Sequence, residues 1–227
     1  MKRCLLLCAS VVLGICLLAG LSASAQTEVY RSIKTDKMQI AITFDDGPHP
    51  RLTQEILAIL ERYNVKSTFF MVGENVINYP DAARAVLAAG HEVGNHTFSH
   101  SHIEKLSERQ VREELGRCED ALEELFEYRP HLFRPPQGAL NEYVEYCSEH
   151  FDYTLILWSL DTRDWEVKNA EQIAEAVLSK IAPGDIVLMH DYIGYQSKTP
   201  EALEIILPKL IEMGYEPVTV GRLLGIS

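Results

Sequence analysis

The sequence carries several short groups of residues that are suited to chemistry, and the first is a pair of carboxylates. Asp45 and Asp46 stand side by side in Thr-Phe-Asp-Asp-Gly, residues 43–47, directly after an apolar run. Neighbouring side chains of a strand point to opposite faces, but a turn at Gly47 allows both carboxylates to face one site. A plain surface turn is an equally ordinary use of this pattern, so other groups must support the interpretation.

Histidines are concentrated in one part of the chain. Four of the eight lie in residues 91–102, and His96 and His100 are four residues apart in His-Thr-Phe-Ser-His. On a helical turn this spacing puts both rings on one face, where two imidazoles and one carboxylate form the open ligand set of a catalytic zinc site. His91 and His102 are interpreted as packing or surface residues, and the spacing from His91 does not fit the His-Glu-x-x-His motif.

Two consecutive prolines precede a backbone donor in residues 134–138, Arg-Pro-Pro-Gln-Gly. Proline has no N–H and restrains the chain to an extended path. The N–H of Gln137 is therefore the first free donor after the pair, and it is presented rigidly. An oxyanion hole requires such a donor, although a plain loop has the same pattern.

Both tryptophans and two acids lie close together in the chain's second half. Trp158 and Trp165 bracket Asp161 and Asp164, which favours acidic groups close to aromatic walls. Further on, His190 ends an apolar run. A histidine at the carboxyl end of a strand in an α/β protein is well placed for catalysis, because ligands bind at that edge of the sheet.

The elements that must position these groups alternate between strand and helix. Strands are predicted at residues 38–44, 66–72, 92–94, 131–134, 153–158, 186–190 and 217–220. Helical starts are indicated by a capping box at Ser107 with Gln110, by Asn169 followed by Gln172, and by Thr199-Pro200. This alternation predicts parallel strands with crossover helices, in one domain whose chemistry lies at the carboxyl ends of the strands.

The first 25 residues have the layout of a secretory signal. Lys2 and Arg3 precede an uncharged run over residues 4–21, and Ala23-Ser24-Ala25 follows. We expect a signal peptide over residues 1–25 with cleavage after Ala25, and a catalytic domain over 26–227. An uncleaved anchor is the alternative, because the run is close to the minimum length of a membrane span.

The net charge of the chain limits the classes of molecule that it can bind. The 33 acidic and 21 basic residues give a net charge of −12, which argues against binding to nucleic acid or an anionic membrane and is compatible with a neutral sugar polymer.

Cleavage of the signal peptide would leave two of the five cysteines, Cys118 and Cys147. Export permits a disulfide between them, and two separate buried thiols are the alternative.

Taken together, the groups resemble the motifs of the polysaccharide deacetylase family, carbohydrate esterase family four, also called the NodB-homology domain. Its pattern of Thr-Phe-Asp-Asp-Gly, His-Ser/Thr-x-x-His, Arg-x-Pro-x-Gly, Asp-x-x-Asp-Trp and Leu-x-His is present, in order, at residues 43–47, 96–100, 134–138, 161–165 and 188–190. The resemblance spans about residues 38–220. It implies an α/β fold, a distorted (β/α) barrel of about seven parallel strands in a single domain.

The resemblance also implies the metal site and the base. Asp46, His96 and His100 would hold a divalent metal, expected to be zinc. Asp45 would be the general base, held by Arg134.

The remaining roles follow from the same resemblance. His190 would be the general acid, oriented by Asp164, and the Gln137 N–H would stabilise the oxyanion. The family usually has Tyr where this chain has Gln137, a departure that affects substrate contacts more than the main-chain donor. The residues expected to contact the substrate are Pro136, Trp165 and Leu188.

The implied function is metal-dependent removal of N-acetyl groups from a polysaccharide of N-acetylglucosamine-type sugars, such as peptidoglycan or a chitin oligomer. The protein is expected to be secreted or at the cell surface, and to be a monomer. One alternative is an O-acetyl esterase acting on xylan with the same site, and another is a non-catalytic glycan-binding protein. A non-haem iron oxygenase also uses two histidines and a carboxylate, but it leaves Arg134, Asp164 and His190 without roles.

Overall fold

The structure is a computed structural model that describes residues 28–192 and 197–226. The signal peptide expected over residues 1–25 lies outside the described residues.

The described residues form one parallel sheet of nine strands. The strands are β1 Val29–Tyr30, β2 Gln39–Asp45, β3 Thr68–Met71, β4 Glu92–Asn95, β5 Leu132–Phe133, β6 Thr154–Ile156, β7 Leu160–Asp161, β8 Ile186–His190 and β9 Glu216–Val218. Their order is β1-β6-β5-β4-β3-β2-β8-β7, and β9 pairs with β2. The seven predicted strands are all present, and two short ones, β1 and β7, were not predicted.

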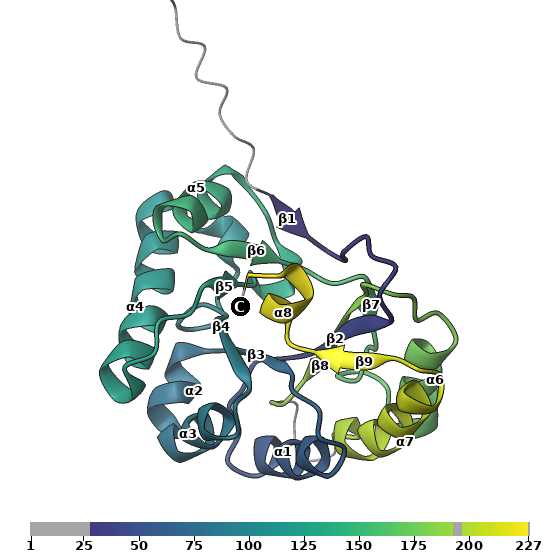
Figure 1. Cartoon of the computed structure of the whole chain (residues 1–227). Coiled ribbons are helices and arrows are strands. Elements are labelled where there is room, and N and C mark those ends of the chain that lie inside the picture. Colours follow the sequence, from purple (N-terminus) through teal and green to yellow (C-terminus); the bar gives the residue numbers. More distant parts are fainter. Residues whose placement is uncertain (1–27, 193–196, 227) are drawn as a thin grey trace, which may run out of the picture.

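Helices surround the sheet (Figure 1). They are α1 Leu52–Arg62, α2 Gly73–Asn78, α3 Pro80–Ala88, α4 Glu108–Phe126, α5 Glu142–His150, α6 Ala170–Leu178, α7 Thr199–Glu212 and α8 Val220–Leu224, with short 3₁₀ turns at Ile103–Lys105 and Pro136–Gly138. The predicted helix starts are confirmed. Ser107 and Gln110 form the capping box of α4, the Asn169 side chain accepts the Gln172 N–H at the start of α6, and α7 begins at Thr199.

The central strands are buried along most of their length because both faces of the sheet are covered. In β2, six of the seven residues are buried. On the outer face, α1, α3, α6 and α7 pack on β2, β3 and β8, and a second outer cluster joins α4 and α5 to β5 and β6. The architecture is therefore an α/β fold in a single domain, consistent with the expected distorted (β/α) barrel.

The inside of the curved sheet has its own small core, which α8 covers at one end. Ala41, Phe70 and Ile156 meet Val220 and Leu223 of α8 there, and Figure 1 shows α8 across the middle of the ring of strands. The start of α8 is held by Thr68 Oγ1, which accepts the Val220 N–H at 2.8 Å. A pocket lies at the other end, where the strands have their carboxyl ends.

Two further observations concern the expectations about cysteines and membranes. Cys118 and Cys147 are both buried and both unpaired, so the two-thiol alternative holds. Among the described residues, no helix has the length and hydropathy needed to span a membrane.

Candidate active site

The predicted chemical groups converge on one pocket at the carboxyl ends of the strands. The parallel pairing of β2 with β8 places Asp45 level with His190, and the chain leaving β4 and β5 continues directly into His96 and Arg134. The pocket has a volume of about 510 Å³. Its lining residues are Asp45, Asp46, His96, His100, Gln137, Trp158, Asp161, Trp165, Leu188 and His190.

The turn after β2 separates the two carboxylates. Asp46 has a left-handed backbone with φ of 76°, so its side chain no longer alternates with that of Asp45. The Asn75 side chain donates to the Asp46 carbonyl at 2.7 Å. At Gly47, a Cβ atom would lie 2.2 Å from the carboxylate oxygens of Asp191, so only glycine fits above this acid. The turn predicted at Gly47 is present.

Asp46, His96 and His100 form a cluster that can hold a metal ion. Asp46 Oδ1 lies 3.4 Å from His96 Nε2 and 3.2 Å from His100 Nε2. One ligand atom from each of the three residues falls within 4.8 Å of the others. Two imidazole nitrogens and one carboxylate oxygen are the donors that zinc accepts in sites with an open position.

The convergence of the two histidines does not come from a helical turn, and that prediction is wrong. Residues 96–100 are an irregular loop in which Thr97 and His100 have positive φ, 67° and 54°. Such conformations are uncommon for residues with a side chain. The loop, rather than helical periodicity, brings His100 back toward His96.

His96 is already in the tautomer that a metal ligand needs. Its Nδ1–H donates to the Arg134 carbonyl at 2.7 Å, since a carbonyl can only accept. The lone pair of the neutral ring therefore lies on Nε2, which faces Asp46. Histidine ligands of metals commonly have this second hydrogen bond.

The ionisation of the cluster also suits a cation. Burial alone would raise the pKa of Asp46, but its close contacts with His100 and His96 outweigh burial and hold the pKa well below the usual range. The hydrogen bond with Asp46 raises the pKa of His100 against the opposing effect of burial. A bound metal ion would replace the proton that lies between His100 Nε2 and the Asp46 carboxylate.

Asp45 is held from the inside of the barrel by Arg134. Arg134 Nη1 donates to Asp45 Oδ1 and to Thr43 Oγ1, each at 2.7 Å, and Nη2 donates to the Leu157 carbonyl at 3.0 Å. The Arg134 side chain is fully buried, with its guanidinium 4.1 Å from the centre of the Phe70 ring. Burial lowers its pKa. The second oxygen, Asp45 Oδ2, is left toward the pocket, 3.8 Å from His96 Nε2.

On the opposite side of the pocket, His190 is paired with Asp164. Asp164 Oδ1 lies 2.7 Å from His190 Nδ1, and Oδ2 accepts both the His190 backbone N–H and the Thr199 hydroxyl. Burial lowers the pKa of His190, but the hydrogen bond with Asp164 and the charges of Asp164, Asp46 and Asp45 outweigh it and raise the pKa to about 9. The ring is therefore protonated at neutral pH.

The Gln137 N–H is a free donor at the pocket. Gln137 has a left-handed backbone, φ 59°, inside the short turn Pro136–Gly138. Within the described residues its N–H has no acceptor, whereas the N–H groups of Gly138 and Ala139 donate to Pro135 and Pro136. A free donor beside the metal-binding cluster can bind an oxygen that gains charge.

Of the three residues expected to contact the substrate, two line the pocket and one does not. Leu188 and Trp165 line the pocket, and Trp165 is 51 % exposed, so its ring is available to a ligand. Pro136 is buried and is not among the pocket's lining residues. It sets the position of Gln137.

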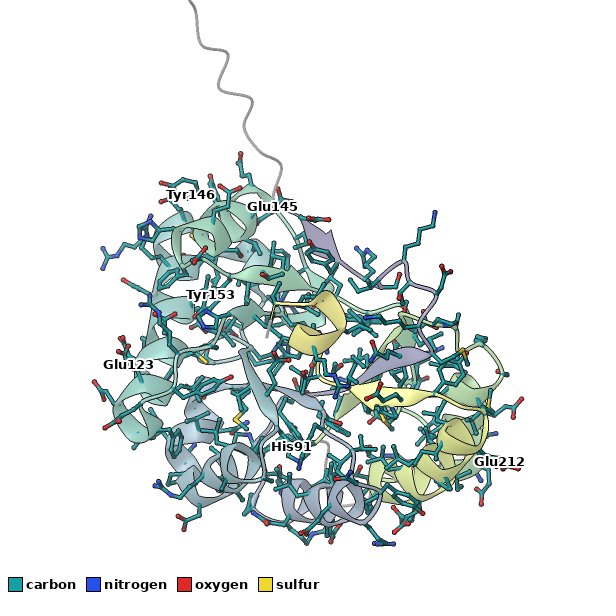
Figure 2. The ribbon with its side chains drawn as sticks, in the orientation of Figure 1. His91, Glu123, Glu145, Tyr146, Tyr153 and Glu212 are labelled. Carbon is teal, nitrogen blue, oxygen red and sulfur yellow. The ribbon has the colours of Figure 1, made fainter. Side chains whose placement is uncertain are left out.

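His91 and His102 stay outside the pocket, as interpreted from the sequence. His91 (Figure 2) is buried, accepts the Ser67 N–H on Nδ1 at 3.1 Å and packs against the Phe69 ring. Burial, together with Lys66, lowers its pKa to about 4. His102 is exposed and lies next to Glu104.

Sequence reasoning missed the residues that hold the site from behind. Thr43 accepts from Arg134, Thr199 donates to Asp164, and Asp191 lies under Gly47. Thr43 is the first residue of the motif at residues 43–47, and Asp191 directly follows the motif at residues 188–190, which was the available signal. Thr199 was interpreted only as a helix start.

The fold and the site define a class: an α/β barrel protein whose pocket joins an Asp-His-His cluster to two pairs of oppositely charged side chains, Asp45–Arg134 and His190–Asp164. Residues 32–156 match the model of the family described as polysaccharide deacetylase. The chain belongs to this family, as the motif resemblance implied.

Curated relatives are named as deacetylases of sugar polymers. A peptidoglycan-N-acetylglucosamine deacetylase of Bacillus cereus is 40 % identical over 187 residues, which are 82 % of this chain and 87 % of that protein. A peptidoglycan-N-acetylglucosamine deacetylase of Listeria monocytogenes is 38 % identical over 205 residues, which are 90 % of this chain but only 42 % of the relative. The chain thus spans less than half the length of that longer relative.

Solved structures of proteins from the same family are similar to this chain. The chain matches the Bc1960 peptidoglycan N-acetylglucosamine deacetylase with a TM-score of 0.83 at 34 % identity, over 87 % of this chain and 92 % of the other. It matches a family 4 acetyl xylan esterase from Clostridium thermocellum, in complex with a cobalt ion, with a TM-score of 0.76 at 35 % identity, over 83 % and 91 %. A family 4 pseudoenzyme from Bacillus anthracis gives 0.82 at 30 % identity, over 88 % and 69 %.

Proposed function

We propose that this protein is a metal-dependent hydrolase that removes N-acetyl groups from a polysaccharide of N-acetylglucosamine-type sugars. The observation that carries the proposal is the meeting of three groups in one pocket: the Asp46–His96–His100 cluster, the Asp45–Arg134 pair and the His190–Asp164 pair. Each supplies a different part of amide hydrolysis.

The donor set fits zinc. Asp46, His96 and His100 would hold the ion, and the hydrogen bond from His96 Nδ1 leaves its Nε2 free for this purpose. When bound, zinc supplies Lewis-acid chemistry: it polarises the acetyl carbonyl and lowers the pKa of water.

Asp45 is the general base. A carboxylate that is not itself a ligand keeps an oxygen for a proton, and Asp45 Oδ2 faces the pocket while Oδ1 is occupied by Arg134. Arg134 keeps the carboxylate in place and compensates its charge inside the barrel. The Asp45 carboxylate accepts the proton of the attacking water.

His190 is the general acid. Its Nδ1–H donates to Asp164, so Nε2 is the atom that gives up a proton to the leaving nitrogen. The raised pKa of His190 ensures that this proton is present at neutral pH. General acid–base catalysis of this kind contributes about 10²–10⁴-fold to a rate.

The backbone N–H of Gln137 donates to the oxygen of the tetrahedral intermediate. Loss of one such donor typically costs about 3 kcal/mol of transition-state stabilisation. The Trp165 ring and Leu188 form the wall against which the acetyl group lies.

The relatives favour an amino-sugar polymer, and peptidoglycan first among them, because proteins that match most of this chain are named for it. A wall polymer requires a location outside the cytoplasm, in agreement with the predicted signal peptide and a mature chain beginning at Gln26. The chain is expected to act as a monomer.

O-deacetylation of xylan is the second candidate, because the chain matches an acetyl xylan esterase over 91 % of that structure. Acetate release by residues 26–227 from N-acetylglucosamine oligomers, peptidoglycan and acetylated xylan separates the two functions. Release from the amino-sugar substrates that a chelator abolishes and zinc restores supports the proposal. Release from xylan alone identifies the esterase, and no release despite bound zinc favours a glycan-binding role.

A further inference from the structure

The loop that carries the second histidine of the cluster is held from two sides by helices. On one side, the N–H groups of Gly73 and Glu74, at the start of α2, donate to the carbonyls of Thr97 and Phe98 at 3.0 and 2.9 Å. These bonds occupy the acceptors of the loop. Its donors must be satisfied elsewhere.

The donors are satisfied by Glu114 of α4. Glu114 Oε2 accepts the N–H groups of Phe98 and Ser99 at 3.0 and 2.8 Å, and Oε1 accepts the Ser99 hydroxyl at 2.9 Å. The half-buried carboxylate thus receives three hydrogen bonds from two successive residues. Two successive N–H groups pointing at one anion form a stable arrangement, and such bonds are stronger than neutral ones.

This contact matters because the loop has an unfavourable backbone. Thr97 and His100 both have positive φ, and neither is glycine. Residues persist in such conformations only where their surroundings hold them. Glu114 binds the two residues that lie between these strained positions.

The two histidines differ in how they are held. His96 is fixed by the Arg134 carbonyl through its ring and by the Met71 carbonyl through its backbone N–H. Within the described residues, the His100 ring has Asp46 as its hydrogen-bonded partner, and its backbone N–H donates only to Thr97 Oγ1, inside the same loop. The position of His100 therefore depends on the loop, and the loop depends on Glu114.

We infer that Glu114 is a positioning residue of the metal site, which sets metal affinity by holding the His96–His100 loop in the conformation that brings His100 to Asp46. The inference rests on the metal site of the proposed function, but it does not depend on which substrate is cleaved.

The experiment measures zinc affinity by competition with a chelating dye. Glu114→Ala is expected to weaken zinc binding by about 10- to 100-fold, the range found when a group that orients a metal ligand is removed. Glu114→Gln keeps one acceptor oxygen and is expected to lose less than tenfold. The matched control is Glu113→Ala, because Glu113 is exposed on the same helix and pairs with exposed Arg109. This control should bind zinc as the unchanged protein does.

A double-mutant cycle tests whether Glu114 acts through His100. In a His100→Ala background, where the residual zinc binding of the remaining ligands Asp46 and His96 is titrated at higher zinc concentrations, Glu114→Ala should weaken zinc binding by less than about threefold further, because residues that act together are not additive. Hydrogen exchange of the Phe98 and Ser99 amides in the metal-free protein should be faster in Glu114→Ala than in Glu113→Ala. Neither readout needs deacetylase activity, so failure of the proposed function is distinguished from failure of this inference.

Unchanged zinc affinity in Glu114→Ala overturns the inference. An equal loss with and without His100 also overturns it, since Glu114 would then act on the site in another way. If Glu114→Ala does not fold, Glu114→Gln carries the same test: a measurable loss of affinity with faster exchange supports the inference, and no change in either contradicts it.

Discussion

Arg134 and Asp45 form an ion pair inside the barrel, with Nη1 and Oδ1 2.7 Å apart and the two side chains 0 % and 5 % exposed. The two residues are 89 positions apart in the chain. Their pairing joins the ends of β2 and β5, and it fixes which oxygen of Asp45 faces the pocket.

Arg134→Ala should strongly destabilise the protein, because it leaves the Asp45 charge buried without compensation. Breaking a buried pair by removing one partner typically costs about 3–5 kcal/mol. Chemical denaturation of the metal-free protein measures the change. As control, Arg62→Ala removes an exposed pair with Glu204 and should cost less than about 1 kcal/mol. Equal stability of the two variants would contradict a structural role for the Arg134 pair.

Asp45→Asn should keep zinc and lose nearly all turnover. An asparagine at this position retains an oxygen for Arg134 but accepts no proton, so the rate should fall by about 10²-fold or more. His96→Ala, in contrast, should lose the metal itself at zinc concentrations that saturate the unchanged protein, because it removes one of three donors. Zinc content and acetate release measured on both variants check the two assignments. Full activity of Asp45→Asn would end the assignment of Asp45 as base.

Sequence patterns were most informative where an element is long and apolar. β8 was predicted with its exact bounds, since an apolar run ends at His190. β1 and β7 have only two residues each, too few for any periodicity. The alternation with helices predicted parallel strands, but it did not give their order. It also did not predict that α8 covers the inner core, because a helix of five residues is too short to show a periodic pattern.

The site was predictable as a set of residues and not as a geometry. A spacing of four residues suggested a helical turn for His96 and His100, but a loop with two left-handed residues satisfies the same spacing. Nothing in the sequence indicates that Glu114, one of many acids on α4, binds that loop. Contacts of this kind depend on which helix face meets which loop, and this is decided by tertiary packing.

The pH dependence of catalysis should report on the His190–Asp164 pair. His190 acts as an acid, so kcat/KM is full while the ring is protonated and falls as the pH rises through its pKa. Because Asp164 raises that pKa, Asp164→Asn should move the alkaline limb of the profile to lower pH. The limb of the zinc-loaded enzyme should lie below 9, because bound zinc neutralises part of the charge of Asp46.

The same shift affects stability. The folded-state pKa of about 9 lies above the ordinary 6.5, so the stability contributed by protonated His190 is present below pH 6.5 and is lost as the pH rises toward 9.

The control for the pH profile of kcat/KM is Glu166→Gln, which removes an exposed partner of Arg163 and should leave the alkaline limb unchanged. A limb that stays in place in Asp164→Asn would show that the pair does not set the acid's pKa.

Gly47→Ala should damage the turn that separates the base from the metal-binding carboxylate. The added methyl group would meet both carboxylate oxygens of Asp191 at 2.2 Å, and Asp191 cannot withdraw, because it is fully buried and its Oδ2 accepts the Thr53 hydroxyl at 2.6 Å. Overpacking of this kind costs about 1–3 kcal/mol. The turn must shift to relieve the contact, so zinc affinity should fall as well, because Asp46 immediately precedes Gly47.

Gly116→Ala is the matched control for this variant, since its methyl group would only touch the Phe151 ring at an ordinary 3.4 Å inside α4. Combining Gly47→Ala with Asp191→Ala removes the atoms that clash, so the double variant should recover part of the lost zinc affinity. Denaturation and zinc titration of the four proteins give the coupling between the two positions. Additive losses of zinc affinity would mean that Gly47 is required for its backbone conformation alone. Recovery in the double variant would mean that the contact between Gly47 and the Asp191 carboxylate fixes the distance between β8 and the turn that holds the metal ligand Asp46.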